Sequence, residues 1–217
     1  MLLTAPLFAQ EKLGDRFVCR PMGYSKFDDR YASLPWNSSN EAFSSALSVL
    51  FSSKDPRVHN MISDLGLLSG PRGFKFLVEH LPLDADRVKQ NFEMRLKNIV
   101  AGNTAHEKYS IIWEDGLVIY QTSTPHDTQF VFSHNPLTKT ASRKQKAADR
   151  FISECHHFDD PTSSYCLVEK FIDDSVRLKV RFPAEDYASG QRIFRYVQRY
   201  VESAILRDSE NVCFNAN

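Results

Sequence analysis

The segment YCLVEKFIDDSVRLKVRF, residues 165–182, decides the fold of this 217-residue chain. Its composition and spacing predict two strands, residues 165–172 and 175–182, joined at Asp173-Asp174. On the second strand, apolar side chains alternate strictly with cations. A period of two is expected when one face of a strand is buried and the other is exposed. The segment therefore predicts a hairpin whose second strand is half exposed.

A long helix is predicted directly after this hairpin. Pro183 ends the second strand, and residues 184–207 then place apolar side chains at helical spacing. The stripe expected to face the core consists of Tyr187, Phe194, Val197, Val201 and Ala204. We expect this segment to form the longest helix of the protein.

Further strands are predicted upstream. Residues 109–113 and 117–121 flank Glu114-Asp115-Gly116, and an Asp-Gly pair between two apolar runs is a strong hairpin signal. Two more strands are expected over residues 74–81 and 128–133.

Other helices are predicted from caps and apolar stripes. Ser38 and Glu41 have capping-box spacing, and Asp55-Pro56 is an N-cap followed by proline at the first helical position. The expected ranges are 39–51, 56–66, 84–100 and, for a short cationic helix, 141–152. Residues 11–36 show no clean period, which indicates an irregular arm or a short strand.

The order of these elements predicts the fold class. Consecutive hairpins favour an antiparallel sheet, and the alternating β-α-β units of a doubly wound nucleotide-binding sheet are absent from the pattern. We expect an α+β fold, with a mostly antiparallel sheet, helices packed on one face and a long C-terminal helix. The length is typical of one domain, so residues 1–217 are interpreted as a single globular domain with an irregular N-terminal arm over residues 1–36.

Charge and composition exclude several classes of protein. Lys plus Arg and Asp plus Glu number 27 each, so the net charge is zero, unlike that of a dedicated nucleic-acid-binding protein. Hydrophobic residues make up 42% and charged residues 25%, the balance of a globular chain rather than a disordered one. No apolar stretch is long enough to span a membrane, and residues 1–10 lack the basic start of a signal peptide. We expect no membrane partner.

The cysteines also bear on the expected location. Cys19, Cys155, Cys166 and Cys213 include no Cys-x-x-Cys pair, so a zinc knuckle or a thioredoxin-like redox site is not expected. A chain of this length does not need disulfides for stability, which favours free thiols in a reducing compartment. A cytoplasmic protein is therefore expected.

Sequence motifs for common catalytic chemistry are missing. The chain contains no glycine-rich phosphate loop, nucleophile elbow, HExxH helix or EF-hand loop, so we expect no cofactor and no metal. The densest group of chemically active side chains is Glu154-Cys155-His156-His157, followed by two aspartates. A solvated polar turn is favoured there over a metal site, because the remaining ligands of a four-coordinate ion would have to come from distant segments.

Cations cluster in three places. They occur in the expected helix 141–152, on the exposed face of strand 175–182 and opposite the apolar stripe of the last helix. The candidate binding residues are Arg143, Lys144, Lys146, Arg150, Arg177, Lys179, Arg192, Arg195 and Arg199. If strand and helix pack together, these clusters could merge into one cationic surface for nucleic acid, an acidic protein or a phosphorylated ligand. The alternative is that they form ordinary solvent-exposed faces.

Three functional hypotheses follow. The leading one is a non-enzymatic interaction module, such as an adaptor, an inhibitor or a subunit of a larger assembly, whose partner is another protein or a protein complex. The first alternative is a nucleic-acid-binding accessory protein that uses the basic surface of the last strand and helix. The second is an enzyme whose site includes some of His126, Asp127, His134, His156 and His157. The enzyme hypothesis requires a pocket that gathers two or more of these side chains.

Overall fold

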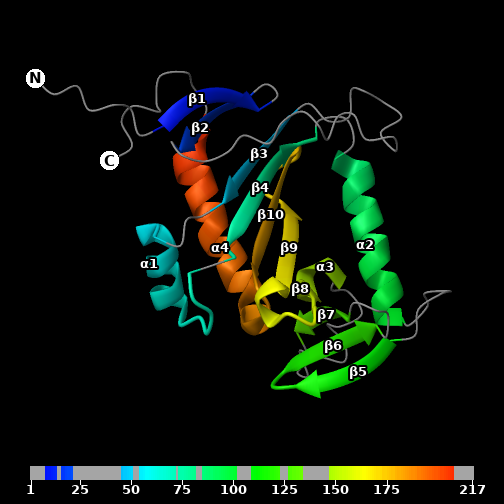
Figure 1. Ribbon diagram of the computed structural model, residues 1–217. Coiled ribbons are helices and arrows are strands. Elements are labelled where there is room, and N and C mark those ends of the chain that lie inside the picture. The colour runs from blue at the N-terminus through cyan, green and yellow to red at the C-terminus, as the bar shows by residue number, and fades with distance from the viewer. Residues whose placement is uncertain are drawn as a thin grey trace, which may run out of the picture.

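The computed structural model describes residues 8–13, 16–21, 45–50, 54–71, 73–81, 85–101, 109–122, 127–133 and 147–207. The strands of the main sheet are β3 (Ser45–Leu50), β4 (Lys75–His80), β5 (Tyr109–Glu114), β6 (Leu117–Thr122), β7 (Thr128–Ser133), β8 (Phe151–His156), β9 (Tyr165–Phe171) and β10 (Val176–Pro183). They form one eight-stranded sheet in the order β3-β4-β10-β9-β8-β7-β6-β5 (Figure 1). Every neighbouring pair in it is antiparallel, so the predicted α+β class is confirmed.

One face of this sheet is covered by α1 (Pro56–Leu65) and α4 (Gly190–Tyr200). Val176, Leu178 and Val180 of β10 are fully buried in the core beneath these helices. The predicted alternation of β10 is therefore confirmed, with its apolar side chains directed toward the helical layer.

The long C-terminal helix is also confirmed, as a succession of helical turns. A 3₁₀ segment (Ala184–Ser189) leads into α4, and a π-helical turn (Val201–Ile205) follows it. A Cβ atom added to Gly190 would lie 2.6 Å from the carbonyl oxygen of Ile152. Glycine at this position therefore permits the close approach of α4 to β8.

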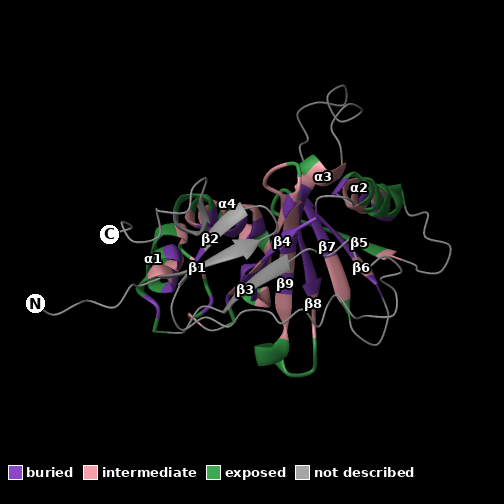
Figure 2. Ribbon diagram, turned by 90° about the horizontal axis from the view of Figure 1, so that it is seen from above, coloured by how far each residue is buried: buried purple, intermediate pink, exposed green. Residues whose placement is uncertain are grey.

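The opposite face is covered over β6, β7 and β8 by α2 (Ala85–Ala101), so helices cover both faces of the sheet and not the one face that was predicted. Leu96 of α2 packs there with Phe130 and Phe132, whereas Val131 between them belongs to the core under α1 and α4. The central strands are thus buried on both faces, as the purple residues in Figure 2 show. Within the described ranges, no helix has both the length and the apolar composition that a membrane span requires.

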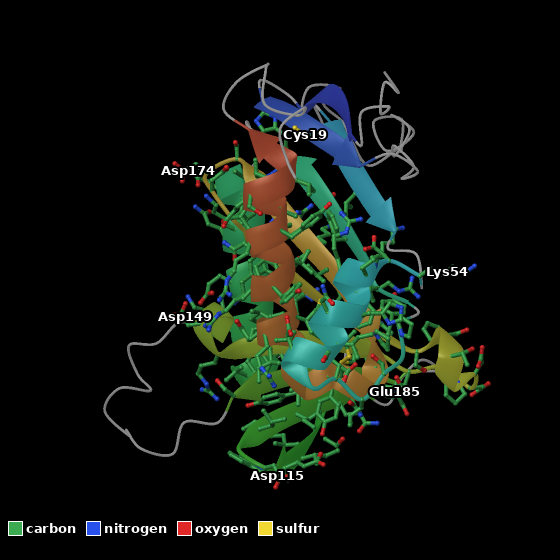
Figure 3. All side chains as sticks on the ribbon, turned by 90° about the vertical axis from the view of Figure 1, so that its left-hand side faces the viewer. Cys19, Lys54, Asp115, Asp149, Asp174 and Glu185 are labelled. Atoms are coloured by element: carbon green, nitrogen blue, oxygen red, sulfur yellow. A yellow bond between two sulfur atoms is a disulfide. The ribbon has the colours of Figure 1, made fainter. Side chains whose placement is uncertain are left out.

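A second, three-stranded sheet is formed by β1 (Phe8–Leu13), β2 (Arg16–Pro21) and β11 (Leu206–Arg207). The first two strands lie in the region expected to contain an irregular arm or a short strand. Their pairing with β11, far away in the sequence, stabilises a hairpin that has no clear period of its own. Cys19 on β2 is buried, and Figure 3 shows it at the end of the molecule opposite to Asp115.

The helix predicted over residues 39–51 is wrong where the structure describes it. Residues 45–50 form β3, which pairs with β4 so that Leu47 lies opposite Val78. The helical spacing of apolar residues spanned only about two turns, and isolated helices that short are marginal without tertiary contacts. Residues 45–50 form a strand instead, because they pair with β4 at the edge of the sheet.

The helix predicted over residues 141–152 is largely wrong as well. Residues 141–146 lie outside the described ranges, α3 covers only Ala147–Arg150, and Phe151 begins β8. The polar turn expected at residues 154–160 consequently starts later, because Glu154 is still in the strand. β8 is buried on both faces and therefore lacks the alternation that marks a half-exposed strand.

The expectation of free thiols is wrong for the three cysteines that the structure describes, and Cys213 lies outside the described residues. Cys155 on β8 and Cys166 on β9 are directly opposite each other and are joined by a disulfide. Both are fully buried. Cys19 also takes part in a disulfide. The sequence could not predict the Cys155–Cys166 bond, because the register that brings the two residues together is set by the pairing of β8 with β9.

Candidate functional site

A polar cavity lies between α2 and the sheet and has a volume of about 480 Å³. Helix α2 contributes Asn91, Arg95 and Asn98 to its wall, and β8 contributes Glu154 and His156. This volume lies within the usual range of small-molecule sites, roughly 300–1,000 Å³. Most of these wall side chains can donate or accept hydrogen bonds, which suits a polar ligand.

A chain of polar contacts crosses one wall of this cavity. Arg95 Nη2 donates to Glu154 Oε1 at 2.8 Å, and His156 Nε2 lies 3.3 Å from the same oxygen. The other ring nitrogen of His156, Nδ1, is 3.4 Å from Thr128 Oγ1. The Arg95 guanidinium also lies over the ring of Phe130, 5.1 Å from its centre. Helix α2 and strands β7 and β8 together hold the Glu154 carboxylate.

The Glu154 carboxylate is kept ionised by these neighbours. Its burial alone raises the pKa, but hydrogen bonds from His156 and Arg95, together with the Arg95 charge, outweigh burial and hold the pKa of Glu154 below its ordinary value. The Glu154 side chain is 11% exposed and that of Arg95 is 48% exposed. The pair therefore places a negative and a positive charge side by side at the cavity.

The enzyme hypothesis requires a pocket that gathers two or more of the side chains singled out from the sequence, and the structure fulfils this requirement only in part. His156 lines the cavity, whereas His157 does not, and the buried Nε2 atom of His157 has no hydrogen-bond partner among the described residues. Burial lowers the pKa of His157, against an opposing effect of the Asp127 charge, and the His157 backbone N–H donates to the Asp127 carbonyl at 3.0 Å. His126 and His134 lie outside the described residues.

A metal site is not formed by the part of the chain that the structure describes. No three side chains among its histidines, cysteines, aspartates and glutamates converge as metal ligands would. In the cluster singled out from the sequence, Cys155 is bonded to Cys166, and its neighbours Glu154 and His156 are directed to the α2 side of the sheet.

Two of the candidate cations on β10 are engaged in ion pairs. Arg177 Nε donates to Glu79 Oε2 at 2.7 Å, and Lys179 Nζ lies 3.4 Å from the same oxygen. Both cations also approach Glu169, at 3.8 and 3.6 Å. Glu79 is only 3% exposed, so this network balances the charges of Arg177 and Lys179 close to the sheet.

The remaining candidate cations are placed elsewhere. Arg192, Arg195 and Arg199 belong to α4, which packs on the opposite face of the sheet from Arg177. Arg150 donates from Nε to the Ser133 carbonyl at 3.1 Å. The other three candidates, Arg143, Lys144 and Lys146, lie outside the described residues. The structure thus separates the strand and helix clusters, and a binding role for either remains a prediction.

A second candidate site is the outer edge of β5. This strand ends the order of the main sheet, and its Ile111, Ile112 and Trp113 side chains are 53%, 40% and 63% exposed. The predicted hairpin between β5 and β6 is confirmed, and its turn has positive φ at Asp115 (41°) and Gly116 (79°). Figure 3 shows Asp115 at the tip of this hairpin. Consecutive exposed apolar side chains on an edge strand are unusual, which makes this edge a candidate interaction surface.

Sequence reasoning missed both sites, although each left a signal. Arg95 is three residues after Phe92 and four before Ile99, so it lies beside the apolar stripe of α2. A cation in that position indicates a buried acidic partner. The Ile-Ile-Trp run was assigned to a strand, but only the strand order shows that this strand is at an edge.

Comparisons of the chain with protein-family models, with curated proteins and with solved structures found no match. The function is therefore inferred from the geometry of the cavity and of the β5 edge.

Proposed function

We propose that this protein is a non-enzymatic interaction subunit that assembles by extending its sheet at β5. The observation behind the proposal is an edge strand with three consecutive exposed apolar side chains, Ile111, Ile112 and Trp113. The occupant that fits this edge best is a second copy of the same chain, because β5 is complementary to itself in an antiparallel arrangement.

The backbone of β5 is oriented for such pairing. In a two-residue hairpin, the residues that flank the turn, Glu114 and Leu117, form a hydrogen-bonded pair. Hydrogen-bonded and non-hydrogen-bonded pairs alternate along an antiparallel ladder. The backbone N–H and C=O groups of Ile112 therefore also point toward β6. The backbone N–H and C=O groups of Ile111 then point away from β6, toward the outer edge. An incoming strand would meet them there.

The side chains support one register. A two-fold axis perpendicular to the sheet keeps each residue on its own face, so directly opposite residues must have the same parity. With the axis at Ile112, the two Ile112 side chains face each other and Ile111 lies opposite Trp113 of the second copy. Ser110 then lies opposite Glu114, so no like charges oppose each other within β5. All three exposed apolar side chains then lie opposite apolar side chains of the second copy.

The strength expected of this contact is moderate. Cross-strand apolar pairs contribute about 0.2–1 kcal/mol each, and a single strand pair belongs at the small end of protein interfaces. We therefore expect a dimer that dissociates on dilution rather than an obligate one.

Sedimentation velocity from micromolar to millimolar concentration tests the proposal. Wild type should dimerise with concentration, and Ile112→Lys should stay monomeric, because two lysines would oppose each other at the axis. Leu68→Lys is the matched control, since Leu68 is 83% exposed and lies outside β5, and it should dimerise as wild type does.

A second variant tests the register itself. In this arrangement the two Ile112 residues form a non-hydrogen-bonded pair with Cα atoms about 4.5 Å apart, a separation that a disulfide accepts. Ile112→Cys should therefore give a disulfide-linked dimer under mild oxidation. A wild type that is monomeric at all concentrations, together with an uncrosslinked Ile112→Cys, would exclude the second copy as the occupant.

Nucleic-acid binding remains an alternative proposal. It retains its arginines on α4, but carboxylates already pair with Arg177 and Lys179 on the strand.

A cytoplasmic location also remains a proposal. The expectation of free thiols favoured it, and the Cys155–Cys166 disulfide removes that support, since such bonds persist mainly in oxidising compartments.

A further inference from the structure

We infer that the cavity between α2 and the sheet binds a small zwitterion of the free α-amino acid type. This inference uses no property of the β5 edge. Its test and the dimerisation test can therefore fail independently of each other.

The Arg95–Glu154 pair supports the inference because it is incompletely bonded. Arg95 has five N–H donors, and within the described residues only Nη2 donates, to Glu154 Oε1. Glu154 Oε2 accepts no hydrogen bond from the described residues, although the side chain is only 11% exposed. Arg95 is 48% exposed, so Glu154 is the buried member of the pair, and a buried carboxylate that serves stability alone is expected to have both oxygens hydrogen-bonded. The unused groups of both partners are available to a ligand in the cavity.

The two charges match the two charged groups of a free amino acid. The guanidinium of Arg95 suits a carboxylate, to which arginine commonly donates two parallel hydrogen bonds. The carboxylate of Glu154 suits an ammonium group. Arg95 Nη2 and Glu154 Oε1 are 2.8 Å apart, so the two sites are adjacent, as the ammonium and carboxylate are on an α-amino acid.

The rest of the wall distinguishes this ligand from a phosphate. Glu154 balances the charge of Arg95 and would repel a phosphate placed beside the guanidinium. Asn91 and Asn98 add neutral amides, and Met94, which is exposed, adds apolar surface for a side chain. With a volume of about 480 Å³, the cavity has room for an amino acid and its side chain.

His156 is a positioning residue in this arrangement. Its ring lies between Thr128 Oγ1 and Glu154 Oε1, so it restrains the carboxylate from one side while Arg95 does so from the other. The same oxygen of Glu154 receives both contacts, which leaves Oε2 for the ligand.

Isothermal titration calorimetry with the common free amino acids, one at a time, tests the inference on the full chain. At least one should bind saturably. Its N-acetyl and its carboxamide derivatives, which each lack one charge, should bind roughly tenfold more weakly or worse, because each loses a charge-assisted hydrogen bond. These derivatives need no protein variant, so the test holds even if a variant fails to fold.

Variants locate the binding at the cavity. Arg95→Met and Glu154→Gln should each weaken binding by roughly tenfold or more. Lys97→Met removes an exposed cation from the same helix and should bind as wild type does. Circular dichroism confirms that each variant is folded. Absence of binding by every amino acid, equal binding of the uncharged derivatives, or unchanged binding by both folded cavity variants would each overturn the inference.

Discussion

Arg177 on β10 and Glu79 on β4 are directly opposite each other, and Arg177 Nε donates to Glu79 Oε2 at 2.7 Å. The two side chains are 13% and 4% exposed, so the bond is shielded from water. Lys179 shares the same carboxylate oxygen. The cations of β10 that the sequence pattern placed on an exposed face thus belong to a shielded network of ion pairs.

Removal of the Glu79 charge should therefore destabilise the protein strongly. Glu79→Gln leaves two cations near a buried, uncharged amide, and we expect a loss of about 3 kcal/mol in the free energy of unfolding, measured with urea. Asp86→Asn is the control, because Asp86 pairs with Lys89 at 3.9 Å on the surface, and it should cost at most about 0.5 kcal/mol. Equal effects of the two substitutions would contradict this account of the network.

The disulfide between Cys155 and Cys166 should contribute measurably to stability. The bond closes a loop with a sequence separation of 11 residues. Loops of this size correspond to about 2–3 kcal/mol in the chain-entropy model. Urea unfolding of the double variant Cys155→Ala, Cys166→Ala should show that loss. In the unfolded wild type, alkylation without reductant should leave both cysteines unmodified, and their modification would refute the bond.

Glu154 should give the stability a dependence on acid. Its pKa in the folded state is below the ordinary value of 4.5, because hydrogen bonds from His156 and Arg95 outweigh burial. Folding therefore favours the ionised form, and its contribution is complete above pH 4.5 and is lost as the pH falls through the lower, folded-state pKa. The difference in unfolding free energy between wild type and Glu154→Gln should shrink in that acidic range. A difference that stays constant there would contradict the shift.

Gly190→Ala should destabilise the protein although alanine is the better helix former. The added Cβ would lie 2.6 Å from the Ile152 carbonyl oxygen, so α4 or β8 must move, at a cost of about 1–3 kcal/mol that exceeds the helix preference of about 1 kcal/mol. Gly70→Ala is the matched control, because nothing lies within 4 Å of the added carbon there. Thermal unfolding of both variants checks the comparison, and a stabilised Gly190→Ala would show that the contact is not tight.

Much of the fold could be predicted from local patterns. The Asp-Gly turn between β5 and β6, the Asp55-Pro56 start of α1 and the alternation of β10 all appear in the structure. In each case a few neighbouring residues determine the conformation, through turn geometry, capping or a period of two. The predictions that were wrong concern β3 and β8, whose conformation depends on strands distant in the sequence.

The candidate sites could be predicted less well for the same reason. Arg95 and Glu154 are 59 residues apart, and only the packing of α2 on β8 brings them into contact. The exposure of Ile112 depends on β5 being the last strand of the sheet, which no local pattern states.

The sequence by itself determined the α+β class, the central hairpins and the C-terminal helix, because these follow from short-range periodicity and turn chemistry. The tertiary structure alone decided which cysteines are bonded, which cations are paired with carboxylates, and which polar side chains surround a cavity. Those outcomes depend on strand register and on the face of the sheet that each helix covers, and both are set by contacts between residues distant in the chain.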